Sequence, residues 1–396
     1  MRISDLFQRG PVRNRFTEDF YRENNCRLSG RRIRKMRNDW IAYASSIPPY
    51  PNVYSGRGIV ICAGGYMYVT CAWINISMLR KSGCSLPVEL WHEGGEINES
   101  MKMKFKELGV ICKDCKDYSQ DSLKGYAMKP FSILNSSFKE VLFLDADNNC
   151  VKDPTYLFDS KEYLKSGTIF WPDAWTTPDS NPIWKIIGCK SDNSKEQESG
   201  QILIDKEKCW KELNLCIYFN ENRELYYKFL LGDKDTFKFA WMALKKEYYM
   251  ISTPLSYAGY TTSNMDFYGM TMVQHDDNGE PVFLHRNLLK WGQMKNDEML
   301  WTTIRKINGD NVRFKPITLK SGNSVINMVS IEGEIECMSF RELFGDYELN
   351  CLQVLKELRS CKSYLDFLTH IILYQTRRTS MEDLSQSFER GAYLIA

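Results

Sequence analysis

The chain has 396 residues, of which 43% are hydrophobic and 13% aromatic, a composition that is typical of a packed globular protein and excludes an intrinsically disordered one. The formal net charge of +2 gives no global field that would favour nucleic acid as a partner. The 13 cysteines are odd in number and scattered along the chain, so they predict no disulfide framework and favour a reducing compartment.

The N-terminal segment, residues 1–56, is predicted to be a basic helical arm followed by a linker. Ten arginines fall between Arg2 and Arg37, but acidic residues are interleaved with them, which argues against a mitochondrial presequence. Such an arm is either a solvated helix or a basic surface for peripheral contact with a membrane or a partner. The stretch SSIPPYPNVYSGRG ends it as a proline- and glycine-rich connector.

Strands and helices alternate from Gly58 onward. The expected strands are 58–63, 86–93, 110–112 and 140–147, and the expected helices between them are Tyr66–Ser82, Asn98–Leu108 and 125–138. Helices that separate successive strands indicate a largely parallel sheet with helices on both faces. The sequence therefore predicts a doubly wound α/β domain.

One segment of this domain needs a separate test, because Ile59–Leu79 contains no charged residue and is long enough to cross a bilayer. Gly64 and Gly65 divide it into a β-branched run and a stretch whose apolar residues fall on one helical stripe. We therefore expect a strand, a glycine turn and an amphipathic helix here, and no transmembrane span or signal peptide.

In the second half of the chain, the sequence predicts fewer strands and helices. Strands are expected at 168–173, 201–205, 249–254 and 281–286, and helices at Lys206–Leu215 and 235–249. Beyond residue 300 come short β-like runs and then a helical stretch, Cys351–Gln375. We divide the chain into the arm at 1–56, a catalytic domain at 57–300 and an extension at 301–396 for acceptor or partner binding.

Two aspartates follow directly after the apolar strand VLFL. Ligands of open α/β sheets bind beyond the carboxyl ends of the strands, and Asp145 and Asp147 reach that edge with their side chains on the same side. Two converging carboxylates repel each other unless a cation lies between them, and a hard divalent ion such as Mg²⁺ or Mn²⁺ suits them. The alternative is a turn in which the aspartates cap backbone amides.

Three further features lie near expected element ends. Asp233 and Asp235 begin a helix, where aspartates are also favoured simply as caps. His285 ends a strand and can supply an imidazole to the same ion, although a lone histidine is usually structural. Glu198 and Gly200 lie just before the strand 201–205, where the glycine lets a ligand approach the backbone closely. The residues alone thus indicate a metal- and phosphate-binding α/β enzyme.

Taken together, the motifs resemble those of the fungal α-mannosyltransferases that extend N-glycan outer chains. The matching stretches are GRGIVICAGG, LPVELWH, GYAMKPFSILNSSFKEVLFLDADN, DPTYLF, GTIFWPDAW, ESGQILID, GDKDTFKFAW and FLHR. They span Gly56 to Arg286 in the family's order. The order of D-x-D, SGQ, GDKD and the late histidine is also similar, more distantly, to glycogenin-type retaining transferases.

The resemblance implies a GT-A fold, a nucleotide-sugar donor with GDP-mannose favoured, a glycan or glycoprotein acceptor, and retention of anomeric configuration. It implies Mn²⁺ (or Mg²⁺) held by Asp145, Asp147 and His285 against the donor diphosphate. The residues that it assigns to donor binding are Cys62, Ala63, Gly64, Lys129, Asp145, Ala146, Trp171, Asp173, Gly200 and Gln201. Among these, Trp171 and Asp173 are expected to line the sugar pocket.

Catalysis is assigned to carboxylates near the reacting carbon. Asp233 and Asp235 are expected to contact the transferred sugar or the acceptor, and Glu198 and Asp235 are the candidates for the group nearest the anomeric carbon. Such a group stabilises the developing cation or attacks it, as the nucleophilic carboxylate of retaining glycosidases does. Double displacement and same-face substitution steered by the leaving phosphate both remain open.

Alternatives to this assignment are the same fold with a UDP-sugar donor, a nucleotide-sugar-binding protein without turnover, and a nucleotidyltransferase. The last is disfavoured because CAGGYMYV lacks the basic residue of a phosphate-binding loop. The fungal enzymes have an N-terminal membrane anchor in the Golgi. With no such anchor visible here, the expected location is the cytoplasm, or the Golgi lumen if the chain is a truncated form.

Overall fold

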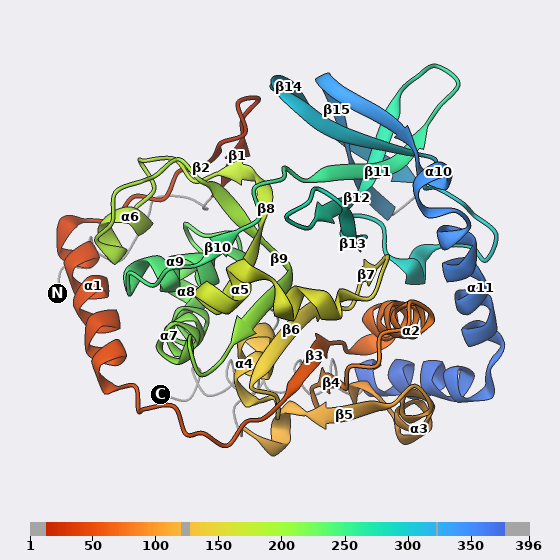
Figure 1. Cartoon of the computed structure of the whole chain (residues 1–396), viewed down its shortest axis with the longest axis horizontal. Helices are drawn as coiled ribbons and strands as arrows, with labels where there is room; N and C mark the ends of the chain where they lie inside the picture. The colour runs from red at the N-terminus through yellow and green to blue at the C-terminus, as the bar shows by residue number, and fades with distance from the viewer. Residues whose placement is uncertain (1–12, 120–126, 322–323, 377–396) are drawn as a thin grey trace, which may run out of the picture.

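The computed structural model describes residues 13–119, 127–321 and 324–376. It contains a large mixed sheet with helices on both faces and a second, antiparallel sheet against one side (Figure 1). The α/β class that the sequence predicted is therefore confirmed. The first two residues of the helix expected at 125–138 lie outside the described residues.

The large sheet has the strand order β10-β8-β9-β6-β3-β4-β5. All of its strands run parallel except β9, which is antiparallel to both of its neighbours. The bounds are β3 Arg57–Cys62, β4 Val88–His92, β5 Val110–Asp114, β6 Glu140–Asp145, β8 Thr168–Thr176, β9 Lys195–Asp205 and β10 Tyr249–Met250. The carboxyl ends of β3 and β6 lie side by side, because Cys62 is paired with Asp145.

Alternating residues of the central strands divide the core into two parts. Ile59 and Ile61 of β3 face one side of the sheet, and Val60 faces the other. The first side carries α2 Gly65–Lys81, α3 Glu99–Glu107 and the second sheet. The other side carries α1 Gly30–Ser46, α4 Met128–Asn135, α6 Ile183–Ile187, α7 Trp210–Glu221, α8 Arg223–Tyr226 and α9 Lys234–Ala243, and α5 Lys161–Ser166 follows β7.

The second sheet has the strand order β11-β14-β15-β12-β13-β7. Its bounds are β7 Asn148–Cys150, β11 Ser256–Thr261, β12 Phe267–His275, β13 Pro281–His285, β14 Thr303–Ser321 and β15 Ser324–Ser339. The short runs expected after residue 300 are thus one long hairpin, and strands from both sides of residue 300 share this sheet. Helices α10 Phe340–Phe344 and α11 Tyr347–Ser360 follow, and residues 362–376 are helical again.

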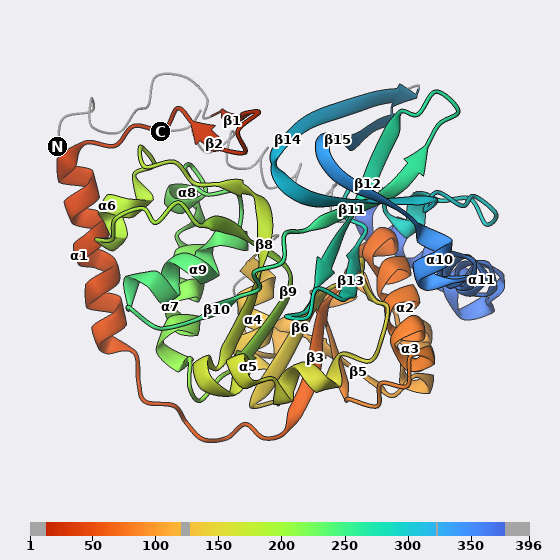
Figure 2. The same ribbon diagram turned by 45° about the horizontal axis from the view of Figure 1, so that its top comes forward.

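The N-terminal arm is only partly helical. A hairpin of β1 Asn14–Phe16 and β2 Arg22–Asn24 precedes α1. This hairpin lies beside the end of β8 in both ribbon views (Figures 1 and 2), and the amide of Thr176 donates to the carbonyl oxygen of Phe20 at 2.7 Å. The hairpin was not expected from the sequence, which has no apolar alternation at this point.

The uncharged segment Ile59–Leu79 forms the strand β3 and the helix α2 on either side of its two glycines, as predicted. Gly65 has a φ of +67°, which only glycine adopts readily, and it begins the helix. None of the helices in the described part of the chain combines the length and the apolar run that crossing a membrane requires.

Candidate active site

The D-x-D aspartates lie where the two sheets meet. Asp145 is the last residue of β6, and the chain then enters β7 of the second sheet at Asn148. Asn148 is paired with His285, the last residue of β13. This register carries the imidazole to the carboxyl end of β6 and brings together all three side chains that the sequence assigned to a metal ion.

Asp145, Asp147 and His285 each offer one ligand atom, and these atoms all lie within 4.8 Å of one another. The Nε2 atom of His285 is 3.4 Å from Oδ1 of Asp147 and 3.8 Å from Oδ2 of Asp145. Asp147 is 2% exposed and His285 is 7% exposed. The aspartates therefore converge and do not cap a turn, which was the alternative that the sequence left open.

Glu198 holds the imidazole of His285 in place. Its Oε1 atom lies 3.0 Å from Nδ1 of His285 and accepts a hydrogen bond of 2.6 Å from the amide of Gly200. Its Oε2 atom accepts from the side-chain amide of Gln201. A carboxylate on the far nitrogen of a histidine fixes the ring so that the other nitrogen can bind a metal. A Cβ on Gly200 would lie 2.5 Å from Nδ1 of His285, so glycine is required here.

Lys129 connects the aspartate pair to the start of α9. Its Nζ atom lies 3.1 Å from Asp145 and 3.2 Å from Asp233, and it donates to the carbonyl and hydroxyl oxygens of Ser199. Burial disfavours the charged lysine, but Asp145, Asp233 and then Glu198 outweigh burial and raise its pKa. The structure thus places Asp233 beside the predicted metal site, through a lysine that the sequence had assigned to donor binding.

Lys290 is a site residue that the sequence analysis missed. Lys290 lies on the loop that follows β13, and its Nζ atom forms an ion pair with Oδ2 of Asp147. A second positive group beside the D-x-D aspartates suits a site that receives a diphosphate. The lysine lies 143 positions from Asp147 in sequence, and the only available signal was its closeness to His285.

The charges of these groups depend on one another. Burial opposes ionisation of Asp147, but Lys290 and His285 outweigh burial and lower the pKa of this carboxyl. Burial likewise opposes charging of His285, but Glu198 and Asp147 raise its pKa to about 10. For Asp145, burial dominates over Lys129 and raises the pKa. The protein's own cations thus partly neutralise the carboxylates in the geometry observed.

The residues present fit a hard divalent cation. Two carboxylates and an imidazole are donors that Mn²⁺ and Mg²⁺ sites use, and the buried Glu198 supplies the orienting contact that metal-bound histidines usually have. The ligand atoms come from β6, the turn after it and β13.

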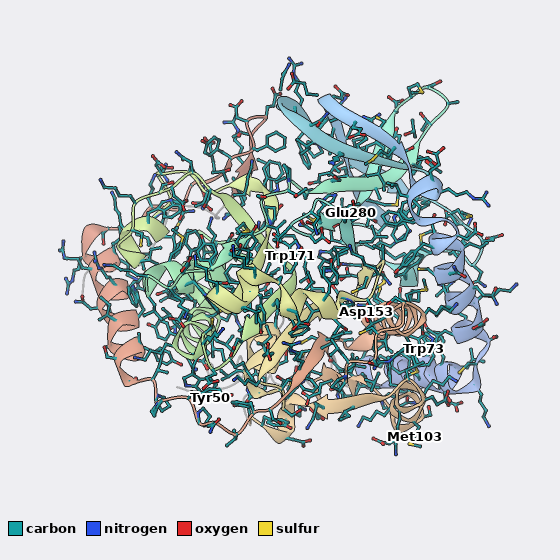
Figure 3. The ribbon with its side chains drawn as sticks, in the orientation of Figure 1. Tyr50, Trp73, Met103, Asp153, Trp171 and Glu280 are labelled. Carbon is teal, nitrogen blue, oxygen red and sulfur yellow. The ribbon has the colours of Figure 1, made fainter. Side chains whose placement is uncertain are left out.

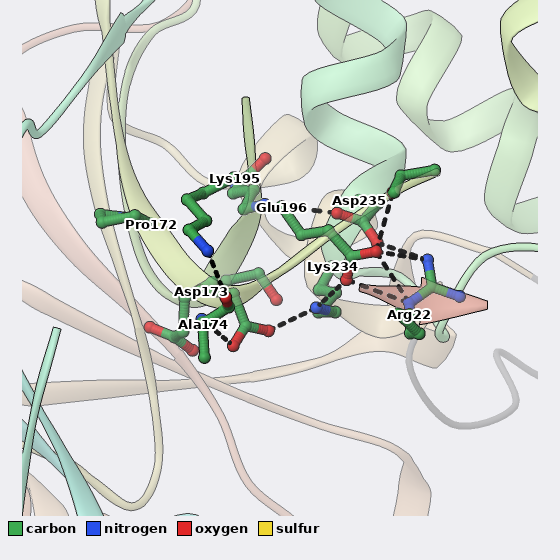
Figure 4. Close-up of polar contacts among 12 residues, drawn as sticks. Arg22, Pro172, Asp173, Ala174, Lys195, Glu196, Lys234 and Asp235 are labelled. Carbon is green, nitrogen blue, oxygen red and sulfur yellow. Dashed lines mark hydrogen bonds and ion pairs between the residues drawn. The ribbon is translucent and has the colours of Figure 1, made fainter. Parts of the chain in front are cut away.

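Asp235 lies in a different cluster from Asp233. Its carboxylate is fully buried, pairs with Arg22 at 3.3 Å and accepts from the amide of Gln197 (Figure 4). Glu196 pairs with the same guanidinium at 2.8 Å and with Lys234 at 2.7 Å. Residues at i and i+2 of a helix point in different directions, so the two aspartates of GDKD separate. Asp235 was expected near the reacting carbon but is enclosed by the N-terminal hairpin.

Titration of Asp235 predicts how stability depends on pH. Burial and the neighbouring Glu196 raise its pKa from 3.8 to about 6. Between these values the folded protein holds a proton that the unfolded chain has lost, so this group lowers the free energy of unfolding as pH rises. Between pH 4 and pH 6 we expect the free energy of unfolding of wild type to fall by about 2 kcal/mol relative to that of Asp235→Asn. Urea titrations at each pH measure this difference.

The matched control for this measurement is Asp39→Asn, because Asp39 forms an exposed pair with Lys35 at 2.7 Å. That variant should follow the pH profile of wild type. Parallel profiles for wild type and Asp235→Asn would contradict the assigned titration.

The remaining predicted donor-binding residues divide into two groups. Trp171 was expected to line the sugar pocket, but it is fully buried near the centre of the molecule (Figure 3). Its indole N–H donates to the carbonyl oxygen of His275, and its ring packs on Phe283. It has no free face for a sugar. Asp173 is partly exposed and pairs with Lys234. The other residues, which lie at or just after the ends of β3 and β6 as expected, are Cys62, Ala63, Gly64 and Ala146.

Comparison with known proteins addresses the family. A family model described as "Mannosyltransferase putative" matches residues 56–198 and 189–276, which together cover more than half of the chain. The chain belongs to this family. The match extends from the linker before β3 to the end of β12, and so includes the two aspartates but ends before His285 and Lys290.

Relatives of this family member include fungal proteins. It is 28% identical over 296 residues to alpha-1,2-mannosyltransferase MNN5 of Saccharomyces cerevisiae, an alignment that covers 58% of this chain and 50% of that protein. It is 31% identical over 287 residues to alpha-1,2-mannosyltransferase MNN21 of Candida albicans, covering 57% and 43% respectively. The chain thus spans about half the length of the curated relatives it matches.

Solved structures give a weaker likeness. The galactosyltransferase LgtC, crystallised with donor and acceptor sugar analogues, is 17% identical with a TM-score of 0.35, covering 49% of this chain and 72% of LgtC. The glycosyltransferase GlyE of Streptococcus pneumoniae is 19% identical with a TM-score of 0.34, covering 50% and 46%. Scores this low do not establish a shared fold by themselves. Family membership and the observed sheet agree with the GT-A fold that the sequence resemblance implies.

Proposed function

We propose that this protein is a Mn²⁺- or Mg²⁺-dependent retaining glycosyltransferase that moves mannose from GDP-mannose onto a glycan acceptor. The observation that carries the proposal is the convergence of Asp145, Asp147 and His285 at the carboxyl edge of the sheet, in a chain whose family is that of mannosyltransferases. A divalent ion bound there supplies positive charge that stabilises the departing nucleoside diphosphate.

The chain's own residues would bind and orient the donor around that position. Lys290 pairs with Asp147 and Lys129 pairs with Asp145. Both ammonium groups therefore lie beside the aspartates at which the donor diphosphate would bind. In the donor complex we expect Lys290 to exchange its aspartate partner for a phosphate oxygen. Lys129 has four acceptors around it and is held more firmly, as a fixed positive charge.

The carboxylates expected nearest the anomeric carbon are both engaged elsewhere. Each oxygen of Glu198 accepts a hydrogen bond from Gly200 or Gln201, and one also contacts His285. Asp235 is paired with Arg22. Neither is free to attack the sugar, and this supports substitution on the same face, in which the leaving phosphate balances the positive charge of the ring. Asp233 is the carboxylate that remains beside Lys129.

A ligand-dependent melting panel tests the donor assignment. With Mn²⁺ present, GDP-mannose at 100 times its dissociation constant should raise the free energy of unfolding by about 2.7 kcal/mol. The same nucleotide sugar with EDTA should give little shift, because the protein's own cations neutralise the carboxylates only in part and no divalent ion then offsets the charge of the diphosphate. UDP-glucose and UDP-galactose form the comparison arm.

Each outcome of the panel has a clear meaning. A shift with UDP-sugars alone would replace GDP-mannose by a uridine donor, which is the runner-up assignment. A shift with GDP-mannose but no release of mannose or transfer on prolonged incubation would support a binding protein without turnover. The absence of any shift would overturn the proposal.

A further inference from the structure

The loop that carries Lys290 is held in place by residues outside the metal site. We call residues 287–294, which follow β13, the Lys290 loop. The ammonium of Lys290 is paired with Asp147, and the next three residues, Trp291–Gln293, form one turn of 3₁₀ helix. Because Lys290 directly precedes this turn, the packing of the turn decides where its ammonium lies.

Arg286 connects the Lys290 loop to the turn that carries the aspartates. It directly follows the histidine of the metal site, and its backbone amide donates to the carbonyl oxygen of Asp147 at 2.9 Å. Its side chain is fully buried, and its Nε atom donates to the carbonyl oxygen of Leu289 at 2.8 Å. Its Cζ atom lies 4.1 Å from the ring centroid of Trp291. One arginine therefore contacts the aspartate turn and both sequence neighbours of Lys290.

The counter-charge of Arg286 comes from the C-terminal extension. Glu348, in the first turn of α11, is 1% exposed and forms an ion pair with Nη1 of Arg286 at 3.5 Å. Its two oxygens accept from the amides of Leu300 and Trp301 at 2.9 and 2.7 Å, and the ring of Trp301 covers the guanidinium at 4.7 Å. A buried guanidinium without a counter-charge is strongly unfavourable. Glu348 therefore stabilises Arg286 in the position from which it holds the loop.

A second residue of α11 holds the same loop through different atoms. Arg359, near the end of the helix, donates to the carbonyl oxygen of Gly292 at 3.2 Å and to the side chain of Asn296 at 2.7 Å. Gly292 also packs against α2, since a Cβ there would lie 2.8 Å from the sulfur of Met67. Helices α2 and α11 lie side by side in both ribbon views (Figures 1 and 2). The loop thus contacts both helices, of which only α2 lies within the family match.

We propose that Glu348 and Arg359 are positioning residues for the donor site, which act through the Lys290 loop to keep the ammonium of Lys290 beside Asp147. Neither residue touches the substrate in this role. Helix α11 then belongs to the donor site in function, although it lies outside the residues that the family model matches. The inference rests on the proposed function, in which Lys290 exchanges Asp147 for a phosphate oxygen of the donor.

Loosening the loop should affect metal binding and donor binding differently. Lys290 and the divalent ion both use the carboxylate of Asp147, so displacing Lys290 removes a competitor of the ion. The diphosphate, in contrast, loses a positive group that was placed to receive it. A general defect in folding would weaken both kinds of binding. The direction of the change in Mn²⁺ affinity therefore distinguishes positioning from simple destabilisation.

The test compares Arg359→Gln, Glu348→Gln and Lys290→Met with wild type in the full chain. Isothermal titration measures the binding of Mn²⁺ alone, and then of GDP at saturating Mn²⁺. We expect each variant to raise the dissociation constant of GDP by about tenfold, which corresponds to about 1.4 kcal/mol, with Mn²⁺ affinity unchanged or higher. The KM for GDP-mannose should rise to a similar extent with little change in kcat, because the contact is made before and during transfer.

Double variants show whether the two residues act through Lys290. If they do, adding Arg359→Gln or Glu348→Gln to Lys290→Met should weaken GDP binding no further, because changes that act on one shared contact are not additive. Fully additive losses would overturn the proposal, as would wild-type GDP affinity in both single variants. Arg359 is only partly buried, so Arg359→Gln keeps the test valid if Glu348→Gln fails to fold.

Arg341→Gln is the matched control. Arg341 lies in the same C-terminal extension and pairs with Asp346 at 3.2 Å, but both side chains are exposed. This variant should bind Mn²⁺ and GDP as wild type does. A loss of GDP affinity in Arg341→Gln equal to that in Arg359→Gln would show that the effect does not come from the Lys290 loop.

Hydrogen exchange in the Lys290 loop separates this inference from the proposed function. Without nucleotide, the loop should exchange faster in Arg359→Gln and Glu348→Gln than in wild type and Arg341→Gln. If wild type binds no Mn²⁺-GDP, the proposed function fails, while faster exchange would still support the hold of α11 on the loop. If wild type binds Mn²⁺-GDP but both variants keep its exchange and its affinity, this inference fails and the proposed function stands.

Discussion

Asp147→Asn is expected to lower the rate of Mn²⁺-dependent donor hydrolysis and transfer by about 1000-fold. Divalent ions contribute several kcal/mol to the stabilisation of developing charge, and each 1.36 kcal/mol changes the rate tenfold. Asp147 is the more buried of the two aspartates and is held ionised by Lys290 and His285. An amide of the same shape keeps the packing but removes the charge that attracts the ion. Steady-state kinetics across a Mn²⁺ titration measure the loss.

Asp159→Asn is the matched control, since Asp159 also pairs with a cation, Arg57 at 2.8 Å, but lies at the surface away from the sheet's carboxyl edge. Both variants should melt within a few degrees of wild type. Full turnover by Asp147→Asn at the wild-type Mn²⁺ optimum would remove the basis for the metal site.

Glu198→Gln is expected to weaken Mn²⁺ binding by 10- to 100-fold, the usual effect of removing a partner that orients a metal-bound histidine. The reason is that Glu198 contacts Nδ1 of His285 at 3.0 Å and is itself bound by Gly200 and Gln201. Because the metal ligands remain, saturating Mn²⁺ should restore most of kcat. Isothermal titration and the Mn²⁺ dependence of the rate are the measurements.

This variant distinguishes two roles for one carboxylate. If Glu198 attacked the anomeric carbon, the loss of kcat would persist at every Mn²⁺ concentration while metal affinity stayed unchanged. Glu140→Gln is the control, because Glu140 pairs with Arg57 at the opposite end of β6. A persistent loss of kcat would return Glu198 to the catalytic role that the family resemblance implied.

Much of the fold was predictable because local patterns in the first half of the chain agree with their surroundings. The glycines at 64 and 65 divide β3 from α2, and Asn98 caps α3 by accepting from the amide of Met101. The aspartates after VLFL were assigned correctly to the carboxyl end of a strand for the same reason. These signals depend on neighbours within a few positions.

Strand β9 was predicted too short because its first half is polar. The residues KEQE do not alternate, yet they lie in a strand, and Glu196 and Glu198 are almost fully buried. Their burial is tolerable only because Arg22, Lys234 and His285 neutralise them. Those partners come from distant segments, so no window of sequence around residue 196 contains the information.

The same limit explains the gaps in the predicted site. Lys290 was missed and Trp171 was assigned wrongly, because ion pairing and burial are tertiary properties. Asp233 and Asp235 looked equivalent in sequence. Because they are two positions apart at the start of α9, their side chains point in different directions, and Asp233 contacts Lys129 while Asp235 contacts Arg22. Residue type and spacing identified which groups carry charge, and only the fold decided which charges meet.

The seam between the two sheets also bears on how the chain matures. β7 pairs with β13 in a register that joins Asn148 to His285, so the catalytic edge is closed by contacts between segments made at very different times during synthesis. Such long-range closures are slow. A nascent chain made only as far as Asp147 carries both aspartates before His285 and Lys290 exist, and nucleotide binding would therefore require synthesis to continue at least to Lys290.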